Sequence, residues 1–275
     1  MIYRFSKMHG AGNDFVVIPD MDAVFPIDDP DYIRLLCDPH TGLGTEGFIV
    51  LRPDEEADFR MIFFNPDGSR ASMCGNGARC AAFYAFSHGI AARLMRFRSD
   101  AGMLSAEILE DTPGRGTVKV RTTLPRNVRA SVVPTGSSRS YFSVDTGVPH
   151  AVAFLDDLSS LDVAAEGRAV RFAPEFAPAG TNVDFVRVVD RSTLELRTYE
   201  RGVEAETAAC GTGALASAVA AIESGVCDSP VSIRVRFGDT LGVDLLRAPD
   251  GSVSAIYLTG PAVVVCEGSF DDRWT

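Results

Sequence analysis

The second half of this 275-residue chain repeats the first at a constant spacing of 136 residues. Residues 74–90 and 210–226 are identical at seven of 17 positions, beginning with Cys-Gly-Asn-Gly-Ala and Cys-Gly-Thr-Gly-Ala. Three more pairs of segments match at this spacing without gaps, namely 15–18 with 151–154, 44–50 with 180–186 and 59–64 with 195–200. Because four matches share one spacing, the chain is predicted to contain two halves of similar fold.

Each half is predicted to wrap a sheet around a buried helix. A run rich in β-branched and aromatic residues, 59–64 or 193–199, indicates a strand in each half. A loop, a Cys-Gly-x-Gly turn and an apolar segment ending at Gly89 or Gly225 follow, and a helix that is apolar on every side is a buried one. Further strands are predicted at 118–122, 143–144, 233–237, 243–246 and 253–258.

These patterns predict an α/β protein of the α+β type, with two similar domains that each hold a mostly antiparallel sheet around a central helix. We expect residues 1–127 to form the N-terminal half, joined by the C-terminal segment 263–275, and residues 128–262 to form the C-terminal half.

Composition excludes several other classes of protein. Hydrophobic residues make up 46% and charged residues 23% of the chain, which is typical of a globular protein. No apolar run is long enough to span a bilayer, and the N-terminus has no apolar signal segment, so a cytoplasmic protein is expected. The net charge of −11, without a basic cluster, argues against nucleic-acid and membrane partners.

The cysteines and lysines restrict the cofactors. None of the six cysteines forms a Cys-x-x-Cys pair or has a histidine at zinc-ligand spacing, so no metal is expected. The two lysines, Lys7 and Lys119, lie in no pyridoxal context, so no cofactor is expected. A free cysteine is ordinarily a small buried hydrophobe, and this interpretation is kept for Cys37, Cys80, Cys227 and Cys266.

Cys74 and Cys210 differ from the other cysteines because each is predicted to begin a helix. The positive end of a helix dipole is expected to lower the pKa of such a thiol, and the bare N–H groups beside it bind anions. One such thiol indicates a nucleophile or a redox group. Two related thiols on opposite faces of one carbon would instead invert a stereocentre, one removing a proton and the other delivering one.

Short motifs spread over nearly the whole chain support this chemistry. They lie at 8–17, 64–68, 73–80, 147–150, 180–185, 199–202, 206–213 and 260–261. In these motifs the sequence resembles the diaminopimelate epimerases, which are amino-acid epimerases that work without a cofactor. The resemblance implies two similar α/β domains with the active site between them, a homodimer, a small amino-acid substrate and a role in lysine biosynthesis.

The resemblance also implies roles for individual residues. Cys74 and Cys210 would be the acid–base pair, with His150 and Glu200 near the thiols to tune their pKa. The substrate-binding residues would be Asn13, Asn65, Gly75, Asn76, Asn182, Glu200, Arg201, Gly211 and Thr212. Without the resemblance, the three asparagines at 13, 65 and 182 would be interpreted as turn residues.

Several positions depart from the pattern of the family, among them Val148, Gly47, Pro39, Thr45, Glu46 and Ala173, and three alternatives stay open. Val148 stands where many members have a substrate-binding asparagine, and Gly47 where some have a polar side chain. The alternatives are a related racemase with another amino-acid substrate, a thiol redox protein, and an amino-acid-binding module without catalysis. The sequence leaves open which cysteine removes the proton from which isomer.

Overall fold

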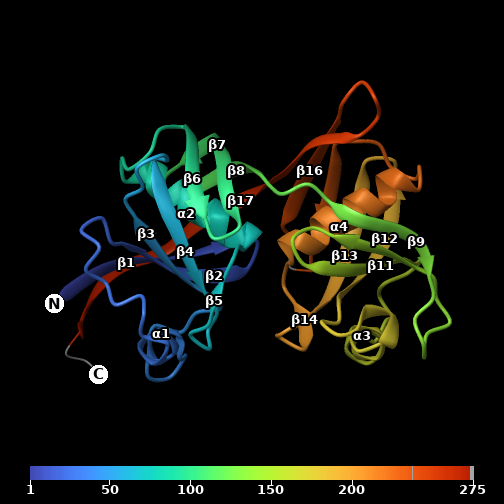
Figure 1. Cartoon of the computed structure of the whole chain (residues 1–275), viewed down its shortest axis with the longest axis horizontal. Helices are drawn as coiled ribbons and strands as arrows, with labels where there is room; N and C mark the ends of the chain where they lie inside the picture. Colours follow the sequence, from blue (N-terminus) through green and yellow to red (C-terminus); the bar gives the residue numbers. More distant parts are fainter. Residues whose placement is uncertain (237, 273–275) are drawn as a thin grey trace. The chain divides into compact units, whose positions relative to one another are not determined.

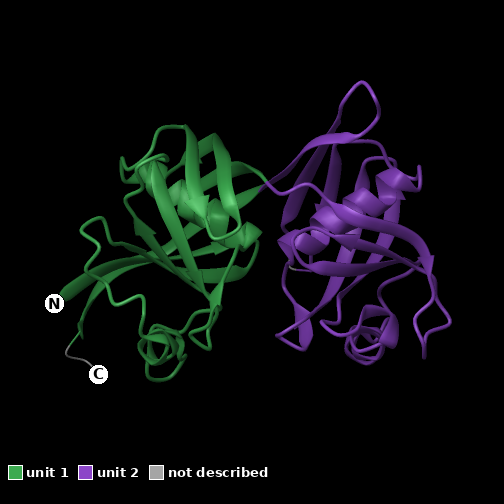
Figure 2. Cartoon of the chain, in the orientation of Figure 1, with its two compact units in different colours: residues 1–121, 260–275 green, residues 122–259 purple. Residues whose placement is uncertain are grey.

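The computed structural model describes residues 1–236 and 238–272, and its chain divides into two compact units (Figure 2). The first unit comprises Met1–Arg121 with Gly260–Thr275, and the second comprises Thr122–Thr259. The sequence placed the divisions after residues 127 and 262, whereas the compact units divide after 121 and 259. Phe237 of the predicted strand 233–237 and residues 273–275 of the predicted terminal segment lie outside the described residues.

The secondary structure forms two series of elements in the same order (Figure 1). The first series is β1 (Ile2–Gly10), β2 (Asn13–Pro19), α1 (Pro30–Cys37), β3 (Phe48–Arg52), β4 (Phe59–Phe64), β5 (Arg70–Ala71), α2 (Gly75–Ser87), β6 (Leu94–Ser99), β7 (Gly102–Thr112), β8 (Arg115–Arg121) and β9 (Arg126–Val132). The second is β10 (Tyr141–Asp145), β11 (Pro149–Phe154), α3 (Val163–Arg171), the 3₁₀ turn η1 (Pro174–Phe176), β12 (Asn182–Asp190), β13 (Thr193–Glu200), β14 (Ala205–Thr207), α4 (Gly211–Glu223), β15 (Val231–Arg234), β16 (Thr240–Arg247) and β17 (Val253–Asp271). Helices α2 and α4 have 13 residues each and begin 136 positions apart.

In the first unit, strands form a closed ring around α2. Neighbours around the ring are β1, β2, β3, β4, β6, β7, β8 and the last part of β17, which pairs again with β1. Most pairings are antiparallel, whereas β2–β3 and β4–β6 are parallel. This arrangement of strands around a helix confirms the predicted α+β class. Among residues 1–236 and 238–272, no helix is long and apolar enough to cross a membrane.

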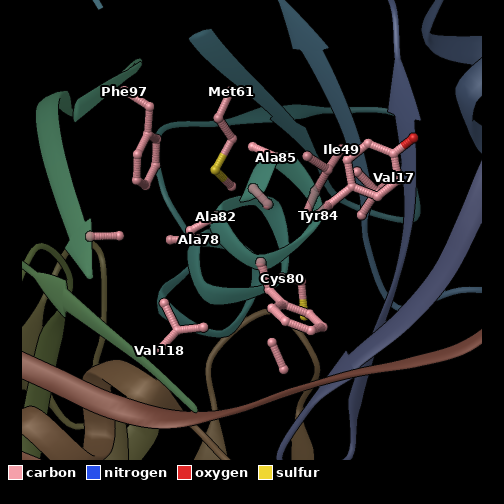
Figure 3. Packing of buried hydrophobic residues seen from close by; sticks show 14 of the residues in the cluster. Val17, Ile49, Met61, Ala78, Cys80, Ala82, Tyr84, Ala85, Phe97 and Val118 are labelled. Atoms are coloured by element: carbon pink, nitrogen blue, oxygen red, sulfur yellow. The ribbon is translucent and has the colours of Figure 1, made fainter. Parts of the chain in front are cut away.

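Helix α2 is the centre of the first unit because its surface is small and apolar. Ala78, Ala82 and Ala85 face strand residues such as Met61 and Phe97 (Figure 3). Small side chains on the helix allow the surrounding strands to approach closely, as dense core packing requires. This packing on all sides fixes the first turn of α2, where Cys74 lies.

The second unit has the same plan, with α4 buried at its centre. Strands β10 to β13, β15, β16 and the first part of β17 hydrogen-bond in this unit. Helix α3 lies beside the strands of this unit (Figure 1), and its buried Val163 and Val170 belong to one core cluster with strand residues such as Phe185. A Cβ atom at Gly167 of α3 would lie 2.4 Å from Cβ of Tyr199, so a glycine permits this close approach.

Each series ends with a strand segment that lies in the unit formed mainly by the other series. Strand β9 ends the first series but pairs with β10 in the second unit. Strand β17 ends the second series, pairs with β16 through its first part, and pairs with β1 of the first unit through its last part, where Ile2 faces Asp271. The sequence predicts a strand over only 253–258, because Gly260 and Pro261 disfavour strands, yet the structure continues it to Asp271.

Candidate active site

Cys74 is the N-cap of α2, as the sequence predicts. Its backbone is extended, and its carbonyl oxygen accepts the first helical hydrogen bond, from the N–H of Ala78 at 2.8 Å. The Sγ atom lies 4.0 Å from Oδ1 of Asn13, at the limit for a thiol that donates to an amide oxygen. The partly exposed thiol therefore lies beside the positive end of the helix dipole.

A chain of hydrogen bonds orients the amide groups next to Cys74. The guanidinium of Arg79 donates to Oδ1 of Asn76 at 2.9 Å. The Asn76 amide then donates to Oδ1 of Asn13 at 3.2 Å, and the Asn13 amide donates to Glu46 at 2.7 Å. Because each amide has a donor on one side and an acceptor on the other, the carbonyl oxygen of Asn13 is directed toward the thiol.

Arg79 is fully buried, and the sequence analysis did not identify it as a functional residue. Its guanidinium also donates to the carbonyl oxygens of Gly75 and Pro261, both at 3.3 Å. A buried cation needs such partners, because burial without them is very unfavourable. A signal was present in the sequence, since Arg79 is the one charged residue of α2 and the equivalent residue of α4 is Leu215.

Asn65 lies in the turn after β4. Its side-chain amide donates to Oγ of Ser69 at 3.0 Å, and its backbone carbonyl oxygen accepts from the N–H of Gly68. These contacts are those of a turn residue, so a role in binding substrate stays a prediction. At Gly47, a Cβ atom would lie 2.7 Å from the ring of Phe63, which explains why a side chain does not fit there without rearrangement.

Cys210 is the N-cap of α4, and its environment differs from that expected. Its Sγ accepts from the N–H of Gly213 at 3.4 Å and lies 3.3 Å from Oγ1 of Thr212. The residue is only 6% exposed. Burial, followed by the nearby charges of Glu200 and Asp184, raises the pKa of Cys210 well above its usual value, and the bonds from Thr212 and Gly213 offset this only in part.

The expectation that the helix start would lower the pKa of this thiol is therefore wrong for Cys210. The helix dipole and its N–H groups act in the expected direction. Removal from water and two carboxylates act in the opposite direction and dominate.

A buried histidine–carboxylate pair lies in the same unit. Nδ1 of His150 lies 2.6 Å from Oδ2 of Asp184, and both side chains are completely buried. Oδ1 of Asp184 also accepts from the hydroxyl of Thr198 at 2.7 Å. The parallel pairing of β11 with β12 places His150 and Asp184 close together. The sequence analysis missed Asp184, although a carboxylate inside the buried run 182–186 was a signal, since buried carboxylates are nearly always paired.

The amide of Asn182 connects this pair to Arg201. Its nitrogen donates to the carbonyl oxygen of Pro149 at 3.1 Å and lies 3.5 Å from Nε2 of His150. Its oxygen accepts from the N–H of Arg201 at 2.8 Å. Glu200 adjoins Arg201, and its charge acts on Cys210. Four predicted site residues therefore lie near α4, namely His150, Asn182, Glu200 and Arg201. Glu200 itself accepts from Thr207 at 2.8 Å.

Taken separately, each unit holds one thiol at the start of a buried helix, beside the amide of Asn13 in the first unit and beside Thr212 and Gly213 in the second. Such a site suits an anionic ligand such as a carboxylate and a proton transfer to or from sulfur. Within the described ranges, no group of three or more His, Cys, Asp or Glu side chains is placed to hold a metal ion.

Comparisons with known proteins agree with the motifs. The family described as "Diaminopimelate epimerase" matches residues 5–128 and 142–265. The diaminopimelate epimerase of Aquifex aeolicus is 41% identical over 281 residues, which cover 98% of each chain. That of Chlorobaculum tepidum is 40% identical over 263 residues, which cover 95% of this chain and 99% of the relative.

Solved structures show the same fold at lower identity. A Bacillus anthracis phenazine biosynthesis protein of the PhzF family has a TM-score of 0.77 at 16% identity, covering 98% of this chain and 99% of its own. A hydroxyproline epimerase from Agrobacterium vitis has a TM-score of 0.74 at 15% identity, covering 99% and 94%. At such identities the likeness concerns the fold alone. Since the family matches most of the sequence and full-length relatives are 40% identical or more, the chain belongs to the diaminopimelate epimerase family.

Proposed function

We propose that this isomerase interconverts LL- and meso-diaminopimelate, in lysine biosynthesis, by moving a proton at the α-carbon between substrate and two cysteines. The observation that carries the proposal is the repeated helix start. Cys74 and Cys210 are N-caps of buried 13-residue helices, 136 positions apart, in a chain of this family. No pyridoxal or metal enters the proposed reaction.

The proposed reaction uses one thiolate and one thiol. The thiolate takes the α-proton from one face of the substrate, which forms an S–H bond and leaves a carbanion. The opposing thiol then gives its proton to the other face, which inverts the centre and leaves a thiolate on the second cysteine. The proposal therefore includes a substrate bound in a cleft between the units, with one cysteine on each face of the α-carbon.

The first turns of α2 and α4 are proposed to bind the α-carboxylate. Backbone N–H groups at Gly75, Asn76, Gly211 and Thr212 are positioned at the positive ends of the two helices. Such groups bind an anion and stabilise negative charge that develops in the transition state. They would act when the carbanion delocalises into the carboxylate.

The remaining predicted residues are proposed to recognise the distal amino-acid group. The amides of Asn13, Asn65 and Asn182 supply hydrogen bonds, the guanidinium of Arg201 matches a carboxylate, and Glu200 matches an ammonium group. His150 and Glu200 are proposed to adjust the thiols; in support, the Glu200 charge raises the pKa of Cys210. From the family resemblance we also propose a homodimer, which sedimentation would test.

Solvent deuterium tests the proposal. In heavy water without added pyridoxal or metal, the enzyme is expected to incorporate deuterium at the α-carbon of diaminopimelate. Cys74→Ala and Cys210→Ala are each expected to lower epimerisation by at least about 100-fold, because each removes one acid–base group. Cys266→Ala is the matched control, since this cysteine is exposed and outside both sites.

The possible results separate the alternatives. Full turnover in either active-site variant would refute the two-thiol mechanism. Exchange with proline but none with diaminopimelate would indicate a related racemase. Turnover that consumes a thiol reductant would indicate a redox protein, and binding without any exchange would indicate a binding module.

A further inference from the structure

Asp184 distinguishes the second thiol site from the first. On β3 of the first unit, the side chain that meets the start of α2 is that of Ile49, which belongs to the apolar core around this helix. A Cβ atom at Gly213 would lie 2.5 Å from Oδ1 of Asp184, which shows that this carboxylate lies against the first turn of α4.

The equivalent glycine of α2 has only apolar neighbours in that direction. A Cβ atom at Gly77 would meet side-chain carbons of Ile49 and Phe15, at 3.1 and 3.4 Å. The two repeated helix starts therefore differ in one respect that matters for a thiol. A buried carboxylate faces the turn that follows Cys210, and hydrocarbon faces the turn that follows Cys74.

The partners of Asp184 hold its carboxylate in one orientation. Oδ1 accepts from Thr198, and Oδ2 lies 2.6 Å from Nδ1 of His150. The amide nitrogen of Asn182, a donor, faces Nε2 of His150 at 3.5 Å. In this pattern Nδ1 of His150 faces the carboxylate and Nε2 faces an amide donor, so the ring fixes the orientation of Asp184.

The titratable groups around Cys210 come from three neighbouring strands. They are Asp184 on β12, Glu200 at the end of β13, and His150 on β11 with its Nδ1 facing Asp184. On α4 itself, Thr212 and Gly213 supply neutral donors. In the first unit, by contrast, the buried cation Arg79 bonds to the carbonyl oxygen of Gly75, the residue after Cys74.

We propose that Asp184 is a positioning residue that keeps Cys210 protonated in the free enzyme, so that Cys210 is the proton donor of the pair. The inference rests on the proposed function. When Cys74 takes the substrate proton, Cys210 gives its own to the product. Resetting the free enzyme then moves one proton from Cys74 to Cys210 through solvent.

A titration without substrate tests this protonation state. The thiolate absorbance of the wild type is measured against pH, and that of Cys210→Ala is subtracted, so that only Cys210 contributes. We expect this difference to stay flat through the pH range in which the exposed Cys266 ionises. For Asp184→Asn, the reference is the double variant that also carries Cys210→Ala. In this pair, Cys210 is expected to ionise at least about one pH unit lower than in the wild type.

Thr198→Val is the matched control, because it removes one hydrogen bond to Asp184 but keeps the carboxylate. We expect it to shift the ionisation of Cys210 less than Asp184→Asn does. Ionisation of Cys210 together with Cys266 in the wild type would overturn the inference, and so would an unchanged titration in Asp184→Asn. If Asp184→Asn does not fold, the wild-type titration still tests whether Cys210 keeps its proton.

The pH profile of kcat/KM supplies the readout that a structural defect alone would not change. Its alkaline limb, where Cys210 loses its proton, is expected to move to lower pH in Asp184→Asn while the acid limb stays in place. A profile that falls at every pH without movement of this limb would refute a role in turnover. Because the titration needs no substrate, its failure is distinguishable from failure of the proposed epimerisation.

Discussion

Replacing Arg79 by methionine tests how the first site is held together. Methionine has similar length but no charge, so Arg79→Met leaves three acceptors without this donor: the carbonyl oxygens of Gly75 and Pro261 and Oδ1 of Asn76. Each buried acceptor left unsatisfied costs about 1–3 kcal/mol. Burial of the methionine side chain returns about 2 kcal/mol. We expect a net loss of about 4 kcal/mol in the free energy of unfolding.

Leu215→Met is the matched control, because Leu215 occupies the equivalent position on α4. An exchange between these apolar residues is expected to cost less than about 1.5 kcal/mol. Urea unfolding followed by circular dichroism measures both variants. Arg79→Met is also expected to raise KM, because the Asn76 and Asn13 amides lose their fixed orientation. Equal stability of the two variants would refute the assigned role of the buried cation.

Two further predictions concern the glycines and the buried thiols. Gly213→Ala is expected to lower the free energy of unfolding by about 1–3 kcal/mol, because the new methyl group meets the hydrogen-bonded carboxylate of Asp184. Gly77→Ala is expected to be milder in the same urea titration, because the flexible end of a side chain can move away, and the opposite order would contradict the packing described. Burial raises the pKa of Cys80 to about 12, so only about one thiol in 10⁴ is ionised at pH 8, whereas Cys266 is exposed. Peptide mapping after brief alkylation of the folded protein is expected to find label on Cys266 and not on Cys80, and rapid labelling of Cys80 would disprove its burial.

Local features of the sequence predicted the helix starts well. A Cys-Gly-x-Gly turn followed by a small, apolar segment specifies a buried helix through contacts close in sequence, and α2 and α4 begin at Gly75 and Gly211. The closing glycines at 89 and 225 have φ of +71° and +73°, a backbone conformation that favours glycine after a helix.

Features that depend on distant pairing could not be predicted in this way. The pKa of Cys210 depends on Asp184, which reaches α4 only because β12 pairs with β11 and β13. The contact of Arg79 with Pro261 joins residues 182 positions apart. Periodicity and composition describe each segment alone, so they carry no information about such neighbours.

The reciprocal placement of β9 and β17 has a consequence for the ancestry of the chain and for how it can be divided. In a half-length polypeptide, one edge of the first strand would lack its pairing strand, and the final strand would have no neighbour to pair with. Two copies could each pair their final strand with the first strand of the other copy. A homodimer with swapped strands is therefore the ancestor that this arrangement suggests for the duplicated chain. For the same reason, a cut near residue 136 is expected to yield fragments that fold only when they are produced together.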